Sequence, residues 1–378
     1  MYVFVFGLLM LVALIEYRTR STQVWKLSYI LLLVMAMFRY GQGTDYFGYN
    51  FNYVNQDEHS EIGYLLLCKL LRSAHIPFYG LIIIISIFDF YCIYKMLNKL
   101  CKYKALSLCM IYPTIYLVYV YSALRQGMVI CFFCGFLLPW IIEKKYINYY
   151  ACAILLCMFH SSALLLLILP IVINISVKSL LEIAIISSGM GAVLFVLPAS
   201  VLSFVNIASF QVYLNQKSLS IIGIAERVFM LLFLIKLFLI VKENQQDNTF
   251  EIMLKIYVIG FSISMFFLPW GTISSRLGAP FKATEIVFIP LALYEIETNS
   301  LRSEGRCLTN GNCTNLYRII LILYLCVMTI KNINMNIAQG EYNCNIVTYP
   351  YISIFNKEDL LDVRNNITYL EMIEEYEQ

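Results

Sequence analysis

The sequence predicts an all-α fold, a polytopic transmembrane helix bundle of about 10–12 spans, and two observations lead to it. First, 60% of the 378 residues are hydrophobic and only 13% are Asp, Glu, Lys or Arg, whereas soluble domains carry roughly 25% charged residues. Second, the hydrophobic residues form long runs that are separated by short charged segments. A chain of this length cannot hide so much apolar surface from water, so the surrounding solvent must be lipid.

The apolar runs define the expected spans, several of them shorter than the ~20 residues usually needed to cross a bilayer. One stretch, 147–177, has two interpretations: a single long tilted helix, or two short helices that meet at His160. We expect an N-terminal helix that is retained rather than cleaved, because no basic segment precedes the first run. The expected spans are 1–15, 24–38, 78–97, 104–121, 124–142, 147–160, 162–177, 179–198, 220–241, 251–270, 277–297 and 316–331.

Positive charge in the loops predicts the orientation of the chain. Arg18, Arg20 and Lys26 follow the first span and should be cytoplasmic, which places the N-terminus outside. With two helices in 147–177, the later Lys and Arg residues also fall at cytoplasmic ends; the one-helix alternative places them outside.

The membrane domain then covers 1–331, with outer loops at 39–77 and 199–219. Within the first loop, EIGYLLLCKLL has apolar residues at helical spacing, which predicts a short helix on the outer membrane surface. The polar tail 332–378 receives no assigned domain.

Several ionisable residues fall at or near the outer face under this topology. Ionisable groups at membrane depth are costly, and they usually face a cavity or a partner. Several cations around one cavity would make an anion site, and the planar fork of Arg suits phosphate oxygens. The residues concerned are Arg39, Asp45, Arg125, His160, Arg227 and Arg276.

Four of these residues also have a purely structural explanation. Arg39 ends a helix, where its side chain can reach up to the headgroups. Asp45 can cap a turn in GQGTDY, and His160 can be a hydrogen-bonded structural residue. Glu226 can neutralise Arg227. Deeper in the membrane, we interpret Asp89 and the i, i+3 pair Lys282 and Glu285 as structural.

The sequence predicts no metal, no cofactor and no nucleic-acid partner. Most of the 12 cysteines stand in apolar runs, where Cys behaves as a small hydrophobic residue. Cys131 and Cys134 have C-x-x-C spacing, but no second pair and no His stand near them. No DxD-like carboxylate pair occurs in an outer loop, which argues against a metal. The Lys and Arg residues are scattered along the sequence, which argues against a nucleic-acid partner.

Four short motifs together resemble the EpsG-like family, which is related to Wzy-type polysaccharide polymerases. They are RYGQGTDYFGY after the second span, LRQG after a tyrosine-rich helix, FHSSAL, and a late SRLGAPF followed by IP. The resemblance runs from the first helix to about Pro290. It places the family's conserved positions on Arg39, Gly43, Thr44, Asp45 and Tyr46, on Arg125 and Gln126, on His160 and Ser161, and on Arg276.

The resemblance implies a role in building exopolysaccharide, capsule or O-antigen at the outer face of a bacterial plasma membrane. The implied partners are undecaprenyl-diphosphate-linked oligosaccharides, membrane lipids and other polysaccharide-assembly proteins. A glycan-transferring polymerase needs cations for its diphosphate leaving group and a base for the attacking hydroxyl. We expect a clamp of Arg39, Arg125 and Arg276, with Arg227 as a further candidate. We expect Asp45 or His160 as the base.

Tyrosines near the outer face have two interpretations, as platforms for sugar rings or as members of an interfacial aromatic belt. They are Tyr40, Tyr46, Tyr49, Tyr53 and Tyr121. Three alternatives to a metal-independent polymerase also remain. A flippase for the lipid-linked sugar would use Asp89, and a non-enzymatic scaffold would need none of the outer arginines. The third alternative is a ligase or a membrane acyltransferase, and an acyltransferase would depend on His160.

Overall fold

The chain forms two compact units of helices in a computed structural model. The structure describes residues 1–21, 23–55, 61–197, 217, 219–242, 248–302, 311–338 and 345–357. Unit 1 comprises Met1–Phe136, Met158–Ser161 and Ser300–Gln378, and unit 2 comprises Leu137–Cys157 and Ser162–Asn299.

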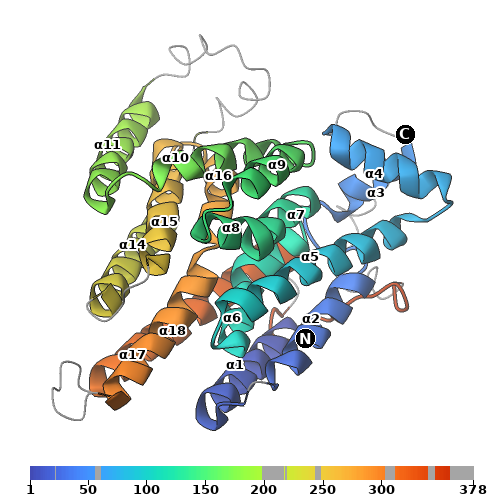
Figure 1. Ribbon diagram of the computed structural model, residues 1–378. Coiled ribbons are helices and arrows are strands. Elements are labelled where there is room, and N and C mark those ends of the chain that lie inside the picture. The colour runs from blue at the N-terminus through green and yellow to red at the C-terminus, as the bar shows by residue number, and fades with distance from the viewer. Residues whose placement is uncertain are drawn as a thin grey trace. The chain divides into compact units, whose positions relative to one another are not determined.

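Unit 1 is built around the N-terminal helices and the last long helix (Figure 1). Helix α1 packs against α6 and α2, and α2 packs against α5. The elements are α1 (Tyr2–Thr19), α2 (Trp25–Phe38), α3 (Tyr46–Asn55), α4 (Ile62–Ser73), α5 (Phe78–Leu100), α6 (Lys104–Ile111), η1 (Tyr112–Val120), α7 (Leu124–Phe132), α18 (Gly311–Asn332) and η4 (Ile333–Ile337).

A proline explains why α6 changes into the π-helix η1. Pro113 has no backbone N–H, so it interrupts the hydrogen-bond ladder of the helix. Turns of π-helix are also frequent at functional sites. The carbonyl of Pro113 accepts a hydrogen bond of 2.7 Å from the side chain of Asn332. The end of α18 is thereby attached to η1.

Unit 2 is centred on α15, which packs against α11, α14 and α16. Lys255 on α15 is buried and donates to the carbonyl of Ile173, 2.9 Å away. The π-helix η2 (Phe133–Leu137) leads into the unit. Its elements are α8 (Leu138–Ile142), α9 (Tyr146–Cys157), η3 (Ser161–Ile168), α10 (Leu169–Val172), α11 (Val177–Val196), α14 (Ile221–Lys242), α15 (Thr249–Phe266), α16 (Gly271–Lys282) and α17 (Glu285–Arg302).

The structure confirms an all-α, polytopic, multi-pass membrane protein. Among the described residues, six helices are long and apolar enough to cross a membrane, and α16 with α17, bent by 41°, is a seventh candidate. Shorter apolar helices add to these, among them α2 and α9. Residues 147–177 form two segments, with the break at Met158–His160.

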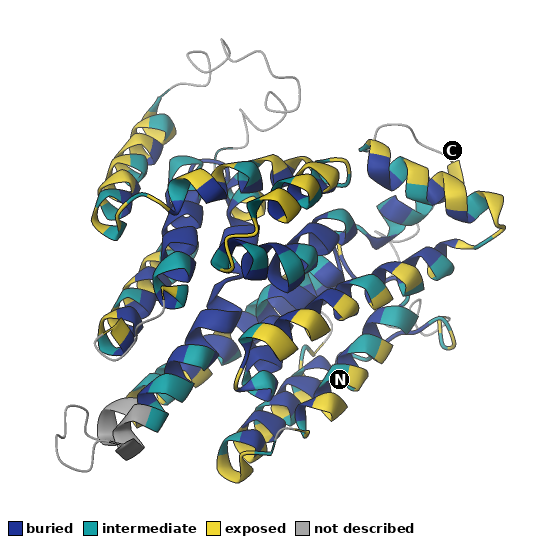
Figure 2. Ribbon diagram, in the orientation of Figure 1, coloured by how far each residue is buried: buried dark blue, intermediate teal, exposed yellow. Residues whose placement is uncertain are grey.

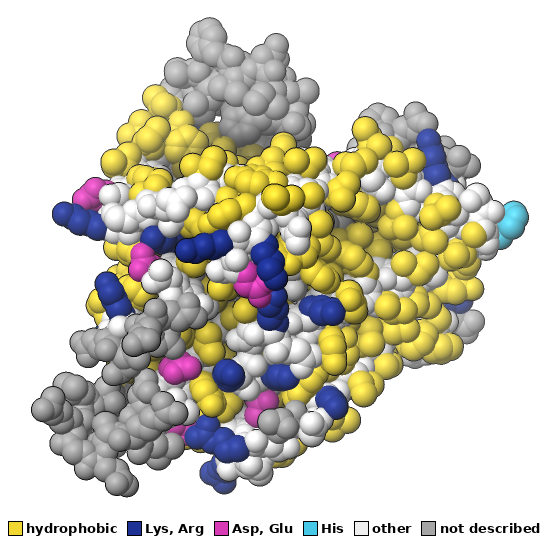
Figure 3. All heavy atoms as spheres, in the orientation of Figure 1, with side chains coloured by type: hydrophobic (Ala, Val, Ile, Leu, Met, Phe, Trp, Pro, Cys, Tyr) yellow, Lys and Arg dark blue, Asp and Glu magenta, His cyan; other side chains and the backbone are white. Residues whose placement is uncertain are grey.

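The outer surfaces of both units have the character expected of lipid-facing helices. On α11, Ile185, Ile186 and Val193 are 73%, 62% and 60% exposed, and Figure 2 shows this helix largely exposed. In unit 1, hydrophobic side chains make up much of the surface over α5 (Figure 3). Large exposed apolar surfaces of this kind are stable only in contact with lipid or protein.

The expected outer loop 39–77 contains two helices, α3 and α4. Helix α4 is amphipathic as predicted: Ile62, Leu66 and Leu70 are exposed, whereas Tyr64 and Cys68 are buried. Its position at the membrane surface stays a prediction. Of the second outer loop, 199–219, all but residues 217 and 219 lie outside the described residues.

The contact between α11 and α15 provides a test of the fold of unit 2. A Cβ atom at Gly191 would lie 1.9 Å from the carbonyl oxygen of Met265, whereas a Cβ at Gly189 would meet no atom within 4 Å. We expect Gly191→Ala to destabilise the protein by ~1–3 kcal/mol through overpacking, measured as a lower melting temperature in detergent. Gly189→Ala on the same helix is the matched control; equal melting temperatures for the two variants would contradict this packing.

Candidate functional site

The RYGQGTDY motif begins where α2 ends, and Arg39 at that point is fully buried. Its side chain donates hydrogen bonds to the carbonyl oxygens of Ala36 (2.6 Å) and Val120 (2.8 Å). The guanidinium lies 4.9 Å from the centre of the Tyr121 ring, a cation–π contact. A cation at a helix C-terminus also suits the helix dipole. These contacts tie the end of α2 to the end of η1.

The turn after Arg39 depends on glycine. Gly43 has φ +107°, and a Cβ atom there would lie 2.3 Å from the carbonyl oxygen of Tyr121. The backbone N–H of Thr44 donates to the hydroxyl of Ser122, 3.2 Å away. The motif therefore lies directly against the segment that joins η1 to α7, at a distance that only glycine permits.

Residues from the C-terminal tail pair with the same motif. Tyr40 N–H donates to the carbonyl of Ile352, and Ile354 N–H donates to the carbonyl of Phe38, both at 3.0 Å. Arg39 and Ser353 form an isolated antiparallel bridge. The described part of the tail, 345–357, is thus built into unit 1, which the sequence did not predict.

Arg125, at the start of α7, lies in a half-buried cage. It forms an ion pair with Glu61, and each of the two side chains is 24% exposed. Its guanidinium lies 5.6 Å from the ring centres of both Tyr49 and Tyr64. Burial raises the pKa of the Tyr49 phenol, and the positive charge of Arg125 offsets only part of this rise. The phenol therefore stays protonated at neutral pH.

Glu61 also connects Arg125 to the FHSS motif. One of its carboxylate oxygens accepts a hydrogen bond of 3.2 Å from the backbone N–H of Ser161. The neighbouring Gly63 N–H donates to the carbonyl of Met158, 2.7 Å away. Glu61 therefore joins two motifs that stand 35 residues apart, counted from Arg125 to His160.

The two candidate bases lie in unit 1, in the segments just described. Asp45 is half-buried directly before α3, and its carboxylate accepts a hydrogen bond of 3.0 Å from the Thr44 hydroxyl. His160 is half-buried and precedes Ser161, whose N–H bonds Glu61. Gln126 is completely buried next to Arg125. Unit 1 thus contains residues from three of the four motifs.

The fourth motif belongs to unit 2. Arg276 is exposed on α16, and Arg227 is half-buried on α14. The neighbouring Glu226 forms an ion pair with Lys282, so Lys282 pairs across helices. The single pocket expected for Arg39, Arg125, Arg276 and Arg227 stays a prediction. Among the residues that the structure describes, no three His, Cys, Asp or Glu side chains gather as a candidate metal site.

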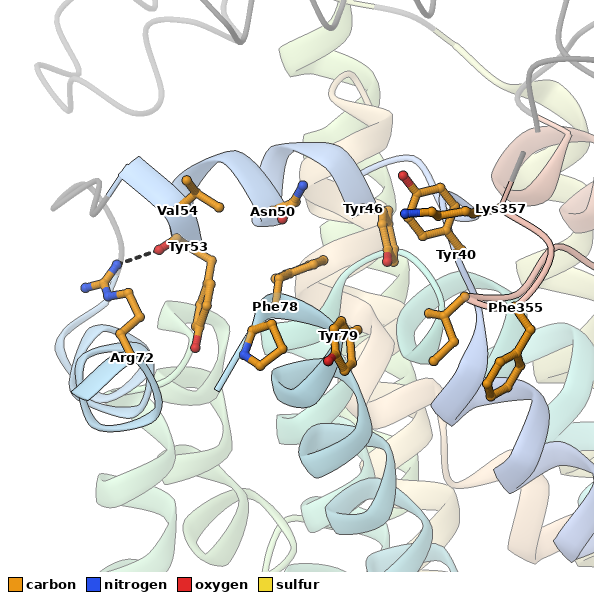
Figure 4. Close-up of a pocket in the computed structure, with 12 residues that line it drawn as sticks. Tyr40, Tyr46, Asn50, Tyr53, Val54, Arg72, Phe78, Tyr79, Phe355 and Lys357 are labelled. Atoms are coloured by element: carbon orange, nitrogen blue, oxygen red, sulfur yellow. Dashed lines mark hydrogen bonds between the residues drawn. The ribbon is translucent and has the colours of Figure 1, made fainter. Parts of the chain in front are cut away.

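A cavity of about 610 Å³ lies within unit 1, next to the RYGQGTDY motif (Figure 4). Three of the five tyrosines predicted near the outer face line it, namely Tyr40, Tyr46 and Tyr53. Tyr49 and Tyr121 are instead buried against Arg125 and Arg39. The remaining lining residues are Asn50, Val54, Arg72, Pro77, Phe78, Tyr79, Ile354, Phe355 and Lys357.

A comparison with known protein families identifies the family of the chain. The EpsG family model matches residues 23–353, most of the chain. The chain belongs to the EpsG family. The match extends beyond the limit near Pro290 that the sequence motifs indicated, and it includes Ile352 and Ser353 of the tail, which pair with Tyr40 and Arg39. No curated protein sequence and no solved structure matches the chain significantly. Membership of the EpsG family identifies this chain as an exopolysaccharide-related membrane protein.

Glu61 is the main residue that sequence reasoning missed. In the sequence it is one acidic residue before an amphipathic helix, with no motif around it. Only the fold brings it to Arg125 and Ser161. Arg72 and Lys357 were missed for the same reason, because neither belongs to a motif.

The ion pair between Arg125 and Glu61 can be measured by a double-mutant cycle. Because both side chains are about three-quarters buried, we expect a coupling energy of about 1 kcal/mol between Glu61→Gln and Arg125→Gln in thermal unfolding in detergent. Gln at position 61 keeps an oxygen for the Ser161 N–H, so the cycle isolates the charge. Additive effects of the two substitutions would contradict the pairing.

Proposed function

We propose that this EpsG-family protein is a membrane polymerase that builds exopolysaccharide, capsule or O-antigen. It transfers a growing glycan between undecaprenyl-diphosphate-linked repeat units at the outer face of the bacterial plasma membrane. The observation that supports this proposal is the convergence in unit 1 of the GTDY, LRQG and FHSS segments on Arg125, Glu61 and Ser122. Their polar side chains come from separate stretches of an otherwise apolar chain.

The reaction assigns a task to each group. The acceptor hydroxyl attacks the anomeric carbon of the donor glycan, the bond from that carbon to the diphosphate oxygen breaks, and the diphosphate leaves with the electron pair. Arg125, with Arg276 and Arg227 as further cations, stabilises the charge on the departing diphosphate. Asp45 or His160 takes the proton of the hydroxyl.

The contacts of Arg125 suit this task. A guanidinium has five N–H donors, and Arg125 uses Nη1 for Glu61 and Nε for Tyr49. The two tyrosine rings and Glu61 hold its plane in one orientation, so less entropy is lost when phosphate oxygens bind. Held in this way, Arg125 is the described arginine best placed to act as a clamp.

Arg39 has a different role in this proposal. Because its side chain is buried among the carbonyls of Ala36 and Val120 and the ring of Tyr121, it positions the GTDY turn. It supports the clamp through this position rather than by contact with the phosphates.

A transporter of the lipid-linked sugar is the second candidate, because of charged groups within the membrane helices. Asp89 on α5 is fully buried, and neither of its carboxylate oxygens has a hydrogen-bond partner within the described residues. In unit 2, Glu285 is buried at the bend between α16 and α17. Discontinuous helices with charged groups near the midplane are common in transporters.

Chain-length analysis of the surface glycan tests the clamp. In a deletion strain, we expect complementation with Arg125→Ala or Arg276→Ala to abolish long polymer. Loss of one donor to a developing oxyanion costs roughly 2–4 kcal/mol of transition-state stabilisation. Arg125→Lys should restore polymer only in part, because Lys lacks the planar fork. Arg18→Ala, an exposed arginine outside the site, is the matched control. Normal long polymer in both Ala variants would refute the clamp.

The intermediate that accumulates in the deletion strain distinguishes the two candidates. For a polymerase, we expect single lipid-linked repeat units on the outer leaflet, where an impermeant glycosidase or periodate can reach them. For a transporter, the same units would remain on the cytoplasmic leaflet and would be protected in intact cells. Protected units would therefore favour the transporter and contradict the polymerase.

A further inference from the structure

The cavity of unit 1 is lined by three separate parts of the chain. Helix α3 contributes Tyr46, Asn50 and Tyr53, and the α4–α5 region contributes Arg72 and Tyr79. The tail contributes Ile354, Phe355 and Lys357. The tail segment is held in place by its backbone pairing with Phe38 and Tyr40. The cavity wall is therefore formed by helices and by a tail segment that backbone hydrogen bonds hold in place.

Aromatic rings form much of the cavity wall. Six of the lining residues are aromatic, and two of these rings are unusually exposed: Tyr79 at 49% and Phe355 at 78%. Flat aromatic faces that carry a polar edge pack well against ligands that are apolar on one side and hydroxylated on the other. The Asn50 amide adds both donors and an acceptor. This combination suits the rings of a saccharide.

Both charged residues that line the cavity are cations. Figure 4 shows the side chains below α3 in a row, with Arg72 at one end and Lys357 and Phe355 at the other. Arg72 is fixed by a 2.7 Å hydrogen bond to the carbonyl of Tyr53 and by a cation–π contact of 5.7 Å with the Tyr53 ring. A ligand that extends along the row would meet positive charge at both ends.

We infer that this cavity binds an acidic saccharide segment, one whose sugars carry carboxylates, such as uronic acids. The aromatic rings would hold the sugar rings, and Arg72 and Lys357 would hold the carboxylates by charge-assisted hydrogen bonds. The inference deepens the proposed function, on which it rests for the source of the saccharide. It also gives the tail a role, because Lys357 and Phe355 complete the binding site.

Direct binding by the purified full chain in nanodiscs of zwitterionic lipid tests the inference. The probe is an end-labelled oligogalacturonate, and its fully methyl-esterified form is a neutral ligand of the same shape. We expect the acid to bind at least about tenfold more tightly than the ester, since a carboxylate paired with a cation contributes on the order of 1.5 kcal/mol.

Matched variants locate the site. We expect the dissociation constant to rise about fivefold in Lys357→Gln and about tenfold in Tyr79→Ala. Lys69→Gln on α4 removes the same charge outside the cavity, and Tyr91→Ala on α5 removes an equally exposed ring, also 49%. Both controls should bind within about twofold of the unaltered protein. Symmetric elution from a sizing column establishes that each variant is folded.

Three results would overturn the inference. Equal binding of acid and ester would refute the role of charge, and absence of binding by either would refute a saccharide site. Displacement of the probe by phosphatidylglycerol in the nanodisc, but not by unlabelled oligogalacturonate, would assign the cavity to lipid headgroups. Because no lipid diphosphate takes part, the measurement is independent of the clamp. Binding with normal polymer in the Arg125→Ala and Arg276→Ala strains would refute only the proposed function.

Discussion

Burial of the Arg39 guanidinium is the constraint on which the described site depends. A buried cation is costly unless its N–H groups find acceptors. Nη1 and Nη2 of Arg39 donate to the carbonyls of Ala36 and Val120, and the guanidinium lies over the face of the Tyr121 ring. Its buried Nε has no hydrogen-bond partner among the described residues. Its backbone at the same time pairs with Ser353 of the tail. One residue therefore joins the end of α2, the end of η1 and the tail. Gly43 and Thr44 can then lie against Tyr121 and Ser122.

Local composition was sufficient to predict most of the helices. The run 78–97 corresponds to α5 (Phe78–Leu100), and 220–241 corresponds to α14 (Ile221–Lys242), because long apolar runs need no distant partner to be recognised. The π-helix η1 was not predicted, since it differs from an α-helix only in its hydrogen-bond pattern. The docking of residues 345–357 was not predicted either. It depends on backbone hydrogen bonds between Tyr40 and Ile352, which carry no signal in side-chain type.

The same division applies to the site. Arg125 could be found in the sequence because it is a cation at the start of an apolar helix. Tyr46 could be found because it follows a glycine-rich turn. Glu61 could not, because its importance comes from contacts with Arg125 and Ser161, which are distant along the chain. Lys282 was expected to pair with Glu285 at i, i+3, whereas the structure pairs it with Glu226 on another helix. Ion pairs inside a bundle follow the packing of helices, which local spacing does not encode.

Reconstitution of the purified protein tests the central claim most directly, namely that the chain itself joins lipid-linked repeat units. Proteoliposomes that contain only this protein and undecaprenyl-diphosphate-linked repeat units would be analysed by mass spectrometry of the lipid-linked products. The account predicts a ladder of longer lipid-linked glycans, release of undecaprenyl diphosphate in equal amount, and neither product with Arg125→Ala. Repeat units that cross the bilayer but stay single would contradict it.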